Sequence, residues 1–152
     1  MAINFVQGQV AISDPNPGGP SATSNIKDKV CKVVKLTSAN FATGNVDALV
    51  AVLPADATIL GFDIWVKTQL AGGSISAATL SLGTAAGGTQ FASASALAFG
   101  VAGTFTAMPA VTGIMQNYNV PYGADVQIFA RGTATTGNPT SGEIYLVISY
   151  VR

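Results

Sequence analysis

Histidine is absent from this 152-residue chain, and cysteine occurs once, as Cys31. Without histidine there is no imidazole to act as a general base or a metal ligand, and a lone cysteine has no partner for an intrachain disulfide. Zinc sites of the usual Cys/His kinds and catalytic triads built on imidazole are therefore excluded. We expect a protein that is not an enzyme and that holds no cofactor and no metal.

Charge is also scarce. Charged residues make up 9% of the chain, where about 25% is typical. Seven basic and seven acidic residues cancel, so no net field draws the chain onto nucleic acid or an anionic membrane. The uncharged stretch from Thr68 to Ala124 is interrupted throughout by Gly, Ser and Thr and contains no run of about 18 apolar residues. We expect neither nucleic acid nor a membrane as a partner.

The N-terminal residues carry no basic side chain ahead of an apolar run, which predicts no secretory signal. The segment Asp14–Pro20 holds three prolines and two glycines, a composition that cannot continue a helix or an inner strand. It predicts a linker, and with it an arm over residues 1–28 and one folded domain over residues 29–152. The apolar side chains that we single out in the arm are Ile3, Phe5 and Val6.

Three behaviours of this arm remain open. An apolar extended segment on a Pro/Gly tether can pack back on its own domain, or it can add to the sheet edge of another protein. It can also remain disordered. The sequence does not choose among them.

The body of the chain shows the period-two alternation of β-strands. Three strands are each predicted to have one buried face, formed by alternate residues. The three sets are Leu60, Phe62, Ile64 and Val66, then Ala78, Leu80 and Leu82, and finally Ala124, Val126, Ile128 and Ala130. Ile144–Val151 is apolar on nearly both faces and predicts a central strand. Further candidates are Val30–Thr37, Asp47–Leu53 and Val101–Ala107, while Thr89–Phe99 leaves helix or irregular loop open. Short strands separated by Gly-rich turns predict an all-β fold, a single antiparallel β-sandwich or a small barrel.

Four of the seven positive charges lie within nine residues, at Lys27, Lys29, Lys32 and Lys35. They form either a docking patch for an acidic surface or an edge strand that lysines protect from aggregation, and the second interpretation is favoured. No aromatic residue lies between them to stack on bases, so nucleic acid has little support.

Trp65, Phe129 and Tyr145 are out of phase with the apolar faces of their strands. An outward tryptophan is a frequent anchor of protein interfaces, whereas in a sheet covered on both faces it is ordinary packing. If the three aromatic side chains share a face, that face is expected to meet another protein.

Two internal segments and the end of the chain carry a family resemblance. Leu53–Phe62, with the sequence LPADATILGF, is followed by TLSLGT at Thr79–Thr84 and by a last strand, Gly142–Tyr150, that ends in tyrosine. The pattern resembles capsid cement or decoration proteins of tailed phages, and it extends over about residues 48 to 152. The resemblance implies a jelly-roll-like sandwich, commonly a homotrimer, that binds the major capsid protein on the outside of an icosahedral head. It also implies a place on the virion surface after synthesis in the host cytoplasm.

Three other functions stay open. A receptor- or glycan-binding module of a fibre or spike would use aromatic platforms at loop tips, for which Tyr118 and Tyr122 are the candidates. A hydrolase would need two facing carboxylates, with Asp56, Asp63 and Glu143 as candidates and nothing in the spacing to favour them. A tail-tube or head-tail joining protein would differ in symmetry rather than in chemistry.

Overall fold

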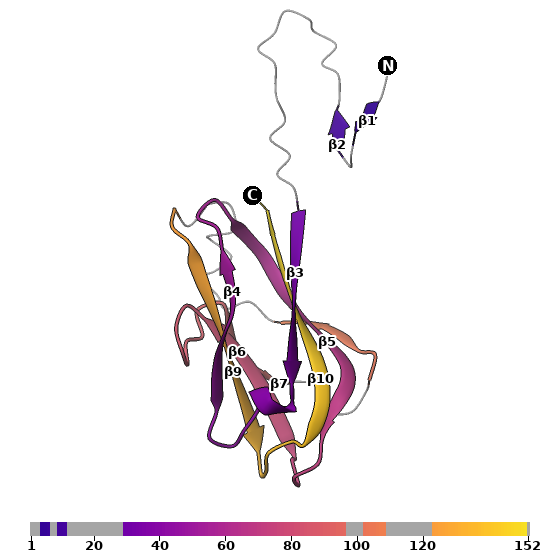
Figure 1. The fold of residues 1–152 in the computed structure, drawn as a ribbon, viewed down its shortest axis with the longest axis vertical. Helices are drawn as coiled ribbons and strands as arrows, with labels where there is room; N and C mark the ends of the chain where they lie inside the picture. Colours follow the sequence, from indigo (N-terminus) through magenta and orange to yellow (C-terminus); the bar gives the residue numbers. More distant parts are fainter. Residues whose placement is uncertain (1–3, 7–8, 12–28, 97–101, 109–122, 152) are drawn as a thin grey trace, which may run out of the picture.

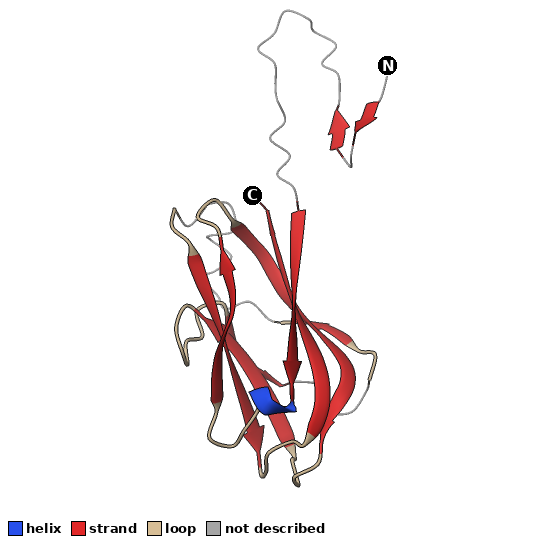
Figure 2. Cartoon of the chain, viewed as in Figure 1, coloured by secondary structure: helices blue, strands red, loops and turns tan. Residues whose placement is uncertain are grey.

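The structure is a computed structural model that describes residues 4–6, 9–11, 29–96, 102–108 and 123–151 (Figure 1). Its elements are strands and one short 3₁₀ helix, so the expected all-β class is confirmed (Figure 2). In chain order they are β1 Asn4–Val6, β2 Gln9–Ala11, β3 Lys29–Thr37, η1 Ser38–Asn40, β4 Val46–Leu53, β5 Thr58–Ala71, β6 Ala77–Gly83, β7 Ala92–Ala96, β8 Phe105–Ala107, β9 Val126–Thr135 and β10 Ser141–Val151.

Eight of these strands form two four-stranded sheets, in the orders β3-β10-β5-β8 and β4-β9-β6-β7. Every neighbouring pair within the two sheets is antiparallel. Most connections along the chain pass from one sheet to the other, which gives the eight-stranded order of a jelly roll. The predicted antiparallel sandwich with jelly-roll-like topology is therefore confirmed.

The core lies between the two sheets and is built from alternate residues of each strand. Ile144, Leu146 and Ile148 of β10 and Leu80, Leu82 and Ile128 of the opposite sheet are almost completely buried. Phe62 of β5 packs against Phe91, with ring centroids 5.7 Å apart. Strand β10 lies between β3 and β5, as predicted for the apolar C-terminal segment. β-Branched and aromatic residues fit this half-buried pleated surface well.

A bulge in β5 makes one sequence prediction wrong. Leu60 was expected on the buried face with Phe62, but its side chain is exposed while Ile59 is buried. The pairing with β10 shifts at this point, because Ser149 lies opposite Gly61 and Tyr150 lies opposite Ile59. The extra residue in β5 reverses the in/out phase of the strand before Gly61 and turns Leu60 outward.

Other segments differ in detail from the prediction. Within Thr89–Phe99, Ala92–Ala96 form a strand, β7, so the helical option is wrong there. Val101 lies outside the described residues, and within residues 102–107 the strand β8 extends over Phe105–Ala107. Ala124 precedes β9 and is exposed rather than buried.

The two strands of the arm, β1 and β2, pair with each other in an antiparallel hairpin, with Phe5 opposite Val10 and Val6 opposite Gln9. They form a sheet of their own, separate from the two sheets of the sandwich (Figure 1). Ile3 and the linker Asp14–Pro20 lie outside the described residues. The first strand of the sandwich begins at Lys29.

Candidate functional site

The outward side of the sheet β3-β10-β5-β8 carries a continuous row of side chains, which we call the aromatic row: Lys35, Tyr145, Trp65 and Phe105. Tyr145 lies opposite Lys35 on one side and opposite Trp65 on the other. Trp65 in turn lies opposite Phe105. Residues paired across antiparallel strands project from the same face, so the row crosses all four strands. We call this side of the sandwich the aromatic face.

Two of the three rings stack on one another. The rings of Trp65 and Tyr145 are 5.2 Å apart between centroids and inclined by 24°. Such a pair contributes about 0.5–1.5 kcal/mol beyond its buried area. Trp65 nevertheless stays 39% exposed and Phe105 61% exposed, and Val33, beside the row on β3, is 57% exposed. The aromatic face is therefore apolar and open to solvent at the row.

A three-residue ionic cluster adjoins the row. Glu143 of β10 accepts hydrogen bonds from the Tyr145 hydroxyl and from Lys67 Nζ at 2.9 Å, and its other oxygen lies 3.0 Å from Lys35 Nζ. The Lys67 ammonium also lies 5.9 Å from the centre of the Tyr145 ring, within cation–π range. One carboxylate therefore binds two ammonium groups within the face.

The pKa of Glu143 shows how strongly this cluster favours the carboxylate. The hydrogen bond from Tyr145 contributes most, followed by those from Lys67 and Lys35, and together they lower the pKa of Glu143 to about 2. The same contact raises the pKa of Lys67, because the ammonium is stabilised chiefly by its hydrogen bond to Glu143. Glu143 is thus ionised at every physiological pH.

The lysines that the sequence grouped together do not share a face. Lys29 and Lys35 project outward from β3, whereas Lys32 is half-buried and alternates inward with Val30 and Val34, which pack against the core. β3 is an edge strand, as the protective interpretation of the lysines requires. An inward-pointing charge on an edge strand obstructs pairing with a further strand. Lys27 lies outside the described residues.

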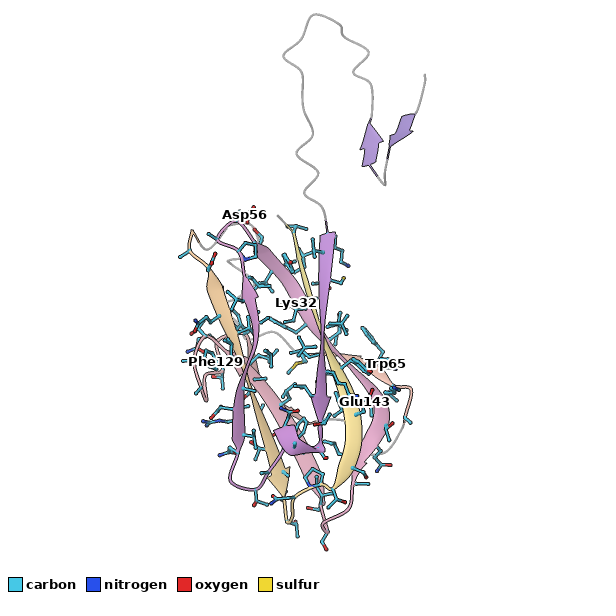
Figure 3. All side chains as sticks on the ribbon, viewed as in Figure 1. Lys32, Asp56, Trp65, Phe129 and Glu143 are labelled. Carbon is cyan, nitrogen blue, oxygen red and sulfur yellow. The ribbon has the colours of Figure 1, made fainter. Side chains whose placement is uncertain are left out.

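Phe129 does not join Trp65 and Tyr145. It belongs to β9 in the other sheet, where it pairs with Leu49 of β4 and Gly83 of β6. Figure 3 shows Trp65 and Phe129 on opposite sides of the sandwich. The condition that all three aromatic residues share one face is therefore not met.

The outward side of the sheet β4-β9-β6-β7, which we call the second face, contains a bidentate ion pair. Arg131 of β9 donates from Nε to Oδ1 of Asp47 at 2.9 Å and from Nη2 to Oδ2 at 2.7 Å. The same Oδ1 accepts the backbone N–H of Gly87 at 2.8 Å, from the loop between β6 and β7. The hydrogen bond from Arg131 is the main cause of the lowered pKa of Asp47. The pair holds that loop against the second face.

The candidate carboxylates of a hydrolase do not form a pair. Asp56 lies in the turn between β4 and β5, while Asp63 and Glu143 project from the middle of the aromatic face and from its end nearer the β9–β10 turn (Figure 3). Over the described ranges, no three acidic or cysteine side chains converge as metal ligands. Tyr118 and Tyr122 lie outside those ranges. In the same part of the chain, no helix is long and apolar enough to cross a membrane.

The sequence did not reveal Phe105, Val33 or the ionic cluster as parts of this site. Phe105 lies in a three-residue strand, and its outward direction depends on pairing with Trp65, far away in sequence. The period-two spacing of Glu143 and Tyr145 was the available signal for a shared face.

The fold and the site define a class: an antiparallel jelly-roll sandwich with one solvent-exposed aromatic face. Among the described residues, the candidate carboxylates do not come together as a catalytic pair. No protein-family model and no curated protein matches the sequence. Two solved structures contain chains of similar fold. A chain in "Cyanophage Pam1 capsid asymmetric unit" is 22% identical over 99% of this chain and 97% of its own length, with a TM-score of 0.53. A chain in "Capsid of Ralstonia phage GP4" is 19% identical over 93% and 91%, with a TM-score of 0.51.

Proposed function

We propose that this protein is a structural component of a phage virion that binds the outer surface of the icosahedral head and stabilises it as a cement or decoration protein. One observation carries the proposal: two chains from phage capsids have this fold, and the match extends over 97% and 91% of their own lengths. The likeness concerns the fold of a whole chain rather than a common module within a larger protein. The major capsid protein is the proposed partner.

The surface chemistry supports this role. A neutral, sparsely charged sandwich with an exposed apolar face is suited to packing against protein. A repeated subunit on a shell engages several neighbours at once, so individually weak contacts raise one another's effective concentration. Bridging adjacent capsomers by such contacts would stiffen the shell.

Purified virions provide the direct test. The protein should be present in a fixed ratio to the major capsid protein, and cryo-electron microscopy should place the sandwich on the outer shell. Heads from a deletion mutant should break at lower temperature and regain stability when the purified protein is added. A chain that is absent from virions, or that is found only on the tail or a fibre, would contradict the proposal.

The arm is the proposed anchor to the shell or to a neighbouring subunit. Deleting residues 2–12 removes β1 and β2 but no strand of the two sandwich sheets, so the body should keep its stability. Occupancy on purified heads should fall. Equal occupancy of the full-length and shortened proteins, with matching thermal unfolding, would remove the arm from the binding mechanism.

The glycan-binding alternative receives no support from the aromatic row. A sugar ring stacks on an open aromatic face, but Trp65 and Tyr145 turn one face each toward the other. The row therefore suits a broad protein contact better than a sugar platform.

Self-association is a further part of the proposal. The resemblance implies a homotrimer, in which each subunit would use two different patches, whereas a two-fold pair uses the same patch twice. The symmetry of the contact depends on how the aromatic face is used.

A further inference from the structure

We infer that the aromatic face pairs with the aromatic face of a second copy of this chain, about a two-fold axis that runs parallel to the strands between β10 and β5. This inference replaces the three-fold contact implied by the resemblance with a two-fold contact, and it does not depend on the virion role. It rests on the extent of the aromatic face, on the arrangement of its charges and on the features that make the other described surfaces less suited to self-association.

The extent matches what a stable pair needs. With a rise of about 3.4 Å per residue and a strand spacing of about 4.8 Å, each residue covers roughly 16 Å² of sheet face. The strands β3, β10, β5 and β8 contribute 9, 11, 14 and 3 residues, and so they present roughly 600 Å². Two such faces bury roughly 1,200 Å², the lower limit of stable interfaces.

The charges select the axis. An axis along the strands exchanges the positions of β10 and β5, which lie side by side in the sheet. Lys67 on β5 and Glu143 on β10 lie at the same height, because they form an ion pair within one copy. Each lysine therefore comes to face the glutamate of the second copy. The same operation sets Tyr145 against Trp65 of the second copy and brings Lys35 over the exposed ring of Phe105.

A two-fold axis across the strands gives the opposite result. It leaves each strand above its own counterpart, so an axis at the height of Lys35 would set Lys35 against Lys35, and an axis at the height of Glu143 would set Glu143 against Glu143. Like charges facing each other in an interface are costly. The arrangement of Lys35, Glu143 and Lys67 therefore favours the axis along the strands.

The other described surfaces are less suited to self-association. The edge strand β3 carries an inward lysine, Lys32, which obstructs edge-to-edge pairing. The second face is crossed by the loop between β6 and β7, which Asp47 and Arg131 hold in place. The aromatic face lacks such a cover at its row, where Phe105 is largely exposed.

The first experiment measures self-association of the full chain by analytical ultracentrifugation. The wild type should sediment as a dimer that dissociates on dilution. Trp65→Ala should raise the dissociation constant about tenfold or more, as for a central interface residue. Phe105→Ala, on the edge strand β8, should raise it less. The matched control is Leu49→Ala on the second face, which is similarly exposed and should leave the constant unchanged. Unchanged far-ultraviolet circular dichroism verifies that each variant folds.

Trp65 is the single tryptophan of the chain, so its emission reports the environment of this face without labelling. Emission should shift to longer wavelength as the wild type is diluted through the dissociation constant. A wild type that remains monomeric at high concentration overturns the inference, and so does a trimer, because a two-fold pair closes at two copies.

A charge exchange tests the axis itself. In a pair of Lys67→Glu copies, the new glutamate of each copy faces Glu143 of the other. In a pair of Glu143→Lys copies, the new lysine of each copy faces Lys67 of the other. Each variant alone should therefore dimerise poorly. An equimolar mixture should form the mixed dimer, because both inter-copy contacts then join opposite charges. Failure of the mixture to associate overturns this axis.

The outcome also distinguishes the inference from the proposed function. If Trp65→Ala weakens binding to phage heads while the wild type stays monomeric in solution, the aromatic face contacts the shell. Self-pairing is then wrong and the virion role stands. If the chain dimerises through this face but is absent from virions, self-pairing stands and the virion role is wrong.

Discussion

The two outer faces of the sandwich use ion pairs for different purposes. On the second face, Asp47 and Arg131 bind each other and the backbone of Gly87, so the pair secures a loop of the same chain. On the aromatic face, Glu143 binds two lysines and a tyrosine within the sheet itself and secures no loop. The ion pair on the second face therefore holds a loop over that face, whereas the ionic cluster on the aromatic face leaves the row of side chains exposed.

This difference shows why exposure alone is a poor guide to an interface. Leu49 and Val52 on the second face are 50% and 45% exposed, more than Trp65 at 39%. The loop between β6 and β7 is held on the same face through Gly87 and Asp47, and it interrupts that face. Trp65 lies in a row that crosses four strands, so its neighbours can be covered together. Continuity of a face decides what can dock on it.

The largest loss of stability is expected from substitutions in the core that the two sheets share. Leu146 supports the aromatic face and Ile128 supports the second face, and both side chains are fully buried. Leu146→Ala and Ile128→Ala should each reduce the free energy of unfolding by about 3 kcal/mol, through lost burial and the cavity that remains. Urea denaturation measures both values. A loss below about 1 kcal/mol for only one of them would mean that the sheets do not share a single core.

A smaller loss of stability should come from a substitution in the loop on the second face. Gly87→Ala places a side chain at φ +73°, where a Cβ meets the Arg131 guanidinium. Gly123 has the same φ of +73° and open space around it, so Gly123→Ala is the matched control. The control should cost about 1 kcal/mol from backbone strain alone. Gly87→Ala should cost more, measured by urea denaturation, and equal losses would show that the loop is not held by Arg131.

The smallest effect concerns Glu143 and depends on pH. The pKa of Glu143 is lowered to about 2 in the folded chain, so its ionised form stabilises the fold above the pKa of the unfolded chain, about 4.3. This stabilisation is lost as the pH falls toward 2. The wild type should unfold at higher temperature than Glu143→Gln at pH 7, and the gap should close between about pH 4.3 and 2. A gap that is constant with pH would exclude the carboxylate as its cause.

The fold was largely predictable, because alternation in β5, β6, β9 and β10 is a local property of the sequence. The bulge at Leu60 was not, since it depends on how Ser149 and Tyr150 pair with β5. The separation of Lys32 from Lys29 and Lys35 was predictable in principle, because residues three apart in a strand lie on opposite faces.

The site was less predictable than the fold. Trp65 and Tyr145 were recognised as outward from their own strands, but their stacking depends on pairing between β5 and β10. Phe129 has the same local pattern and lies on the other sheet. Only the order of strands in the two sheets distinguishes these cases, and that order is a long-range property of the chain.

The position of β10 has a consequence for biosynthesis. This strand lies between β3 and β5, so the sheet β3-β10-β5-β8 has a gap at its centre until residues 141–151 have left the ribosome. Nascent chains therefore hold β3 without a partner in its sheet and β5 paired only with β8, and other polypeptides could bind the open edges. Completion of the sheet must wait until this segment has emerged, and contacts between such distant segments form slowly, over milliseconds to seconds.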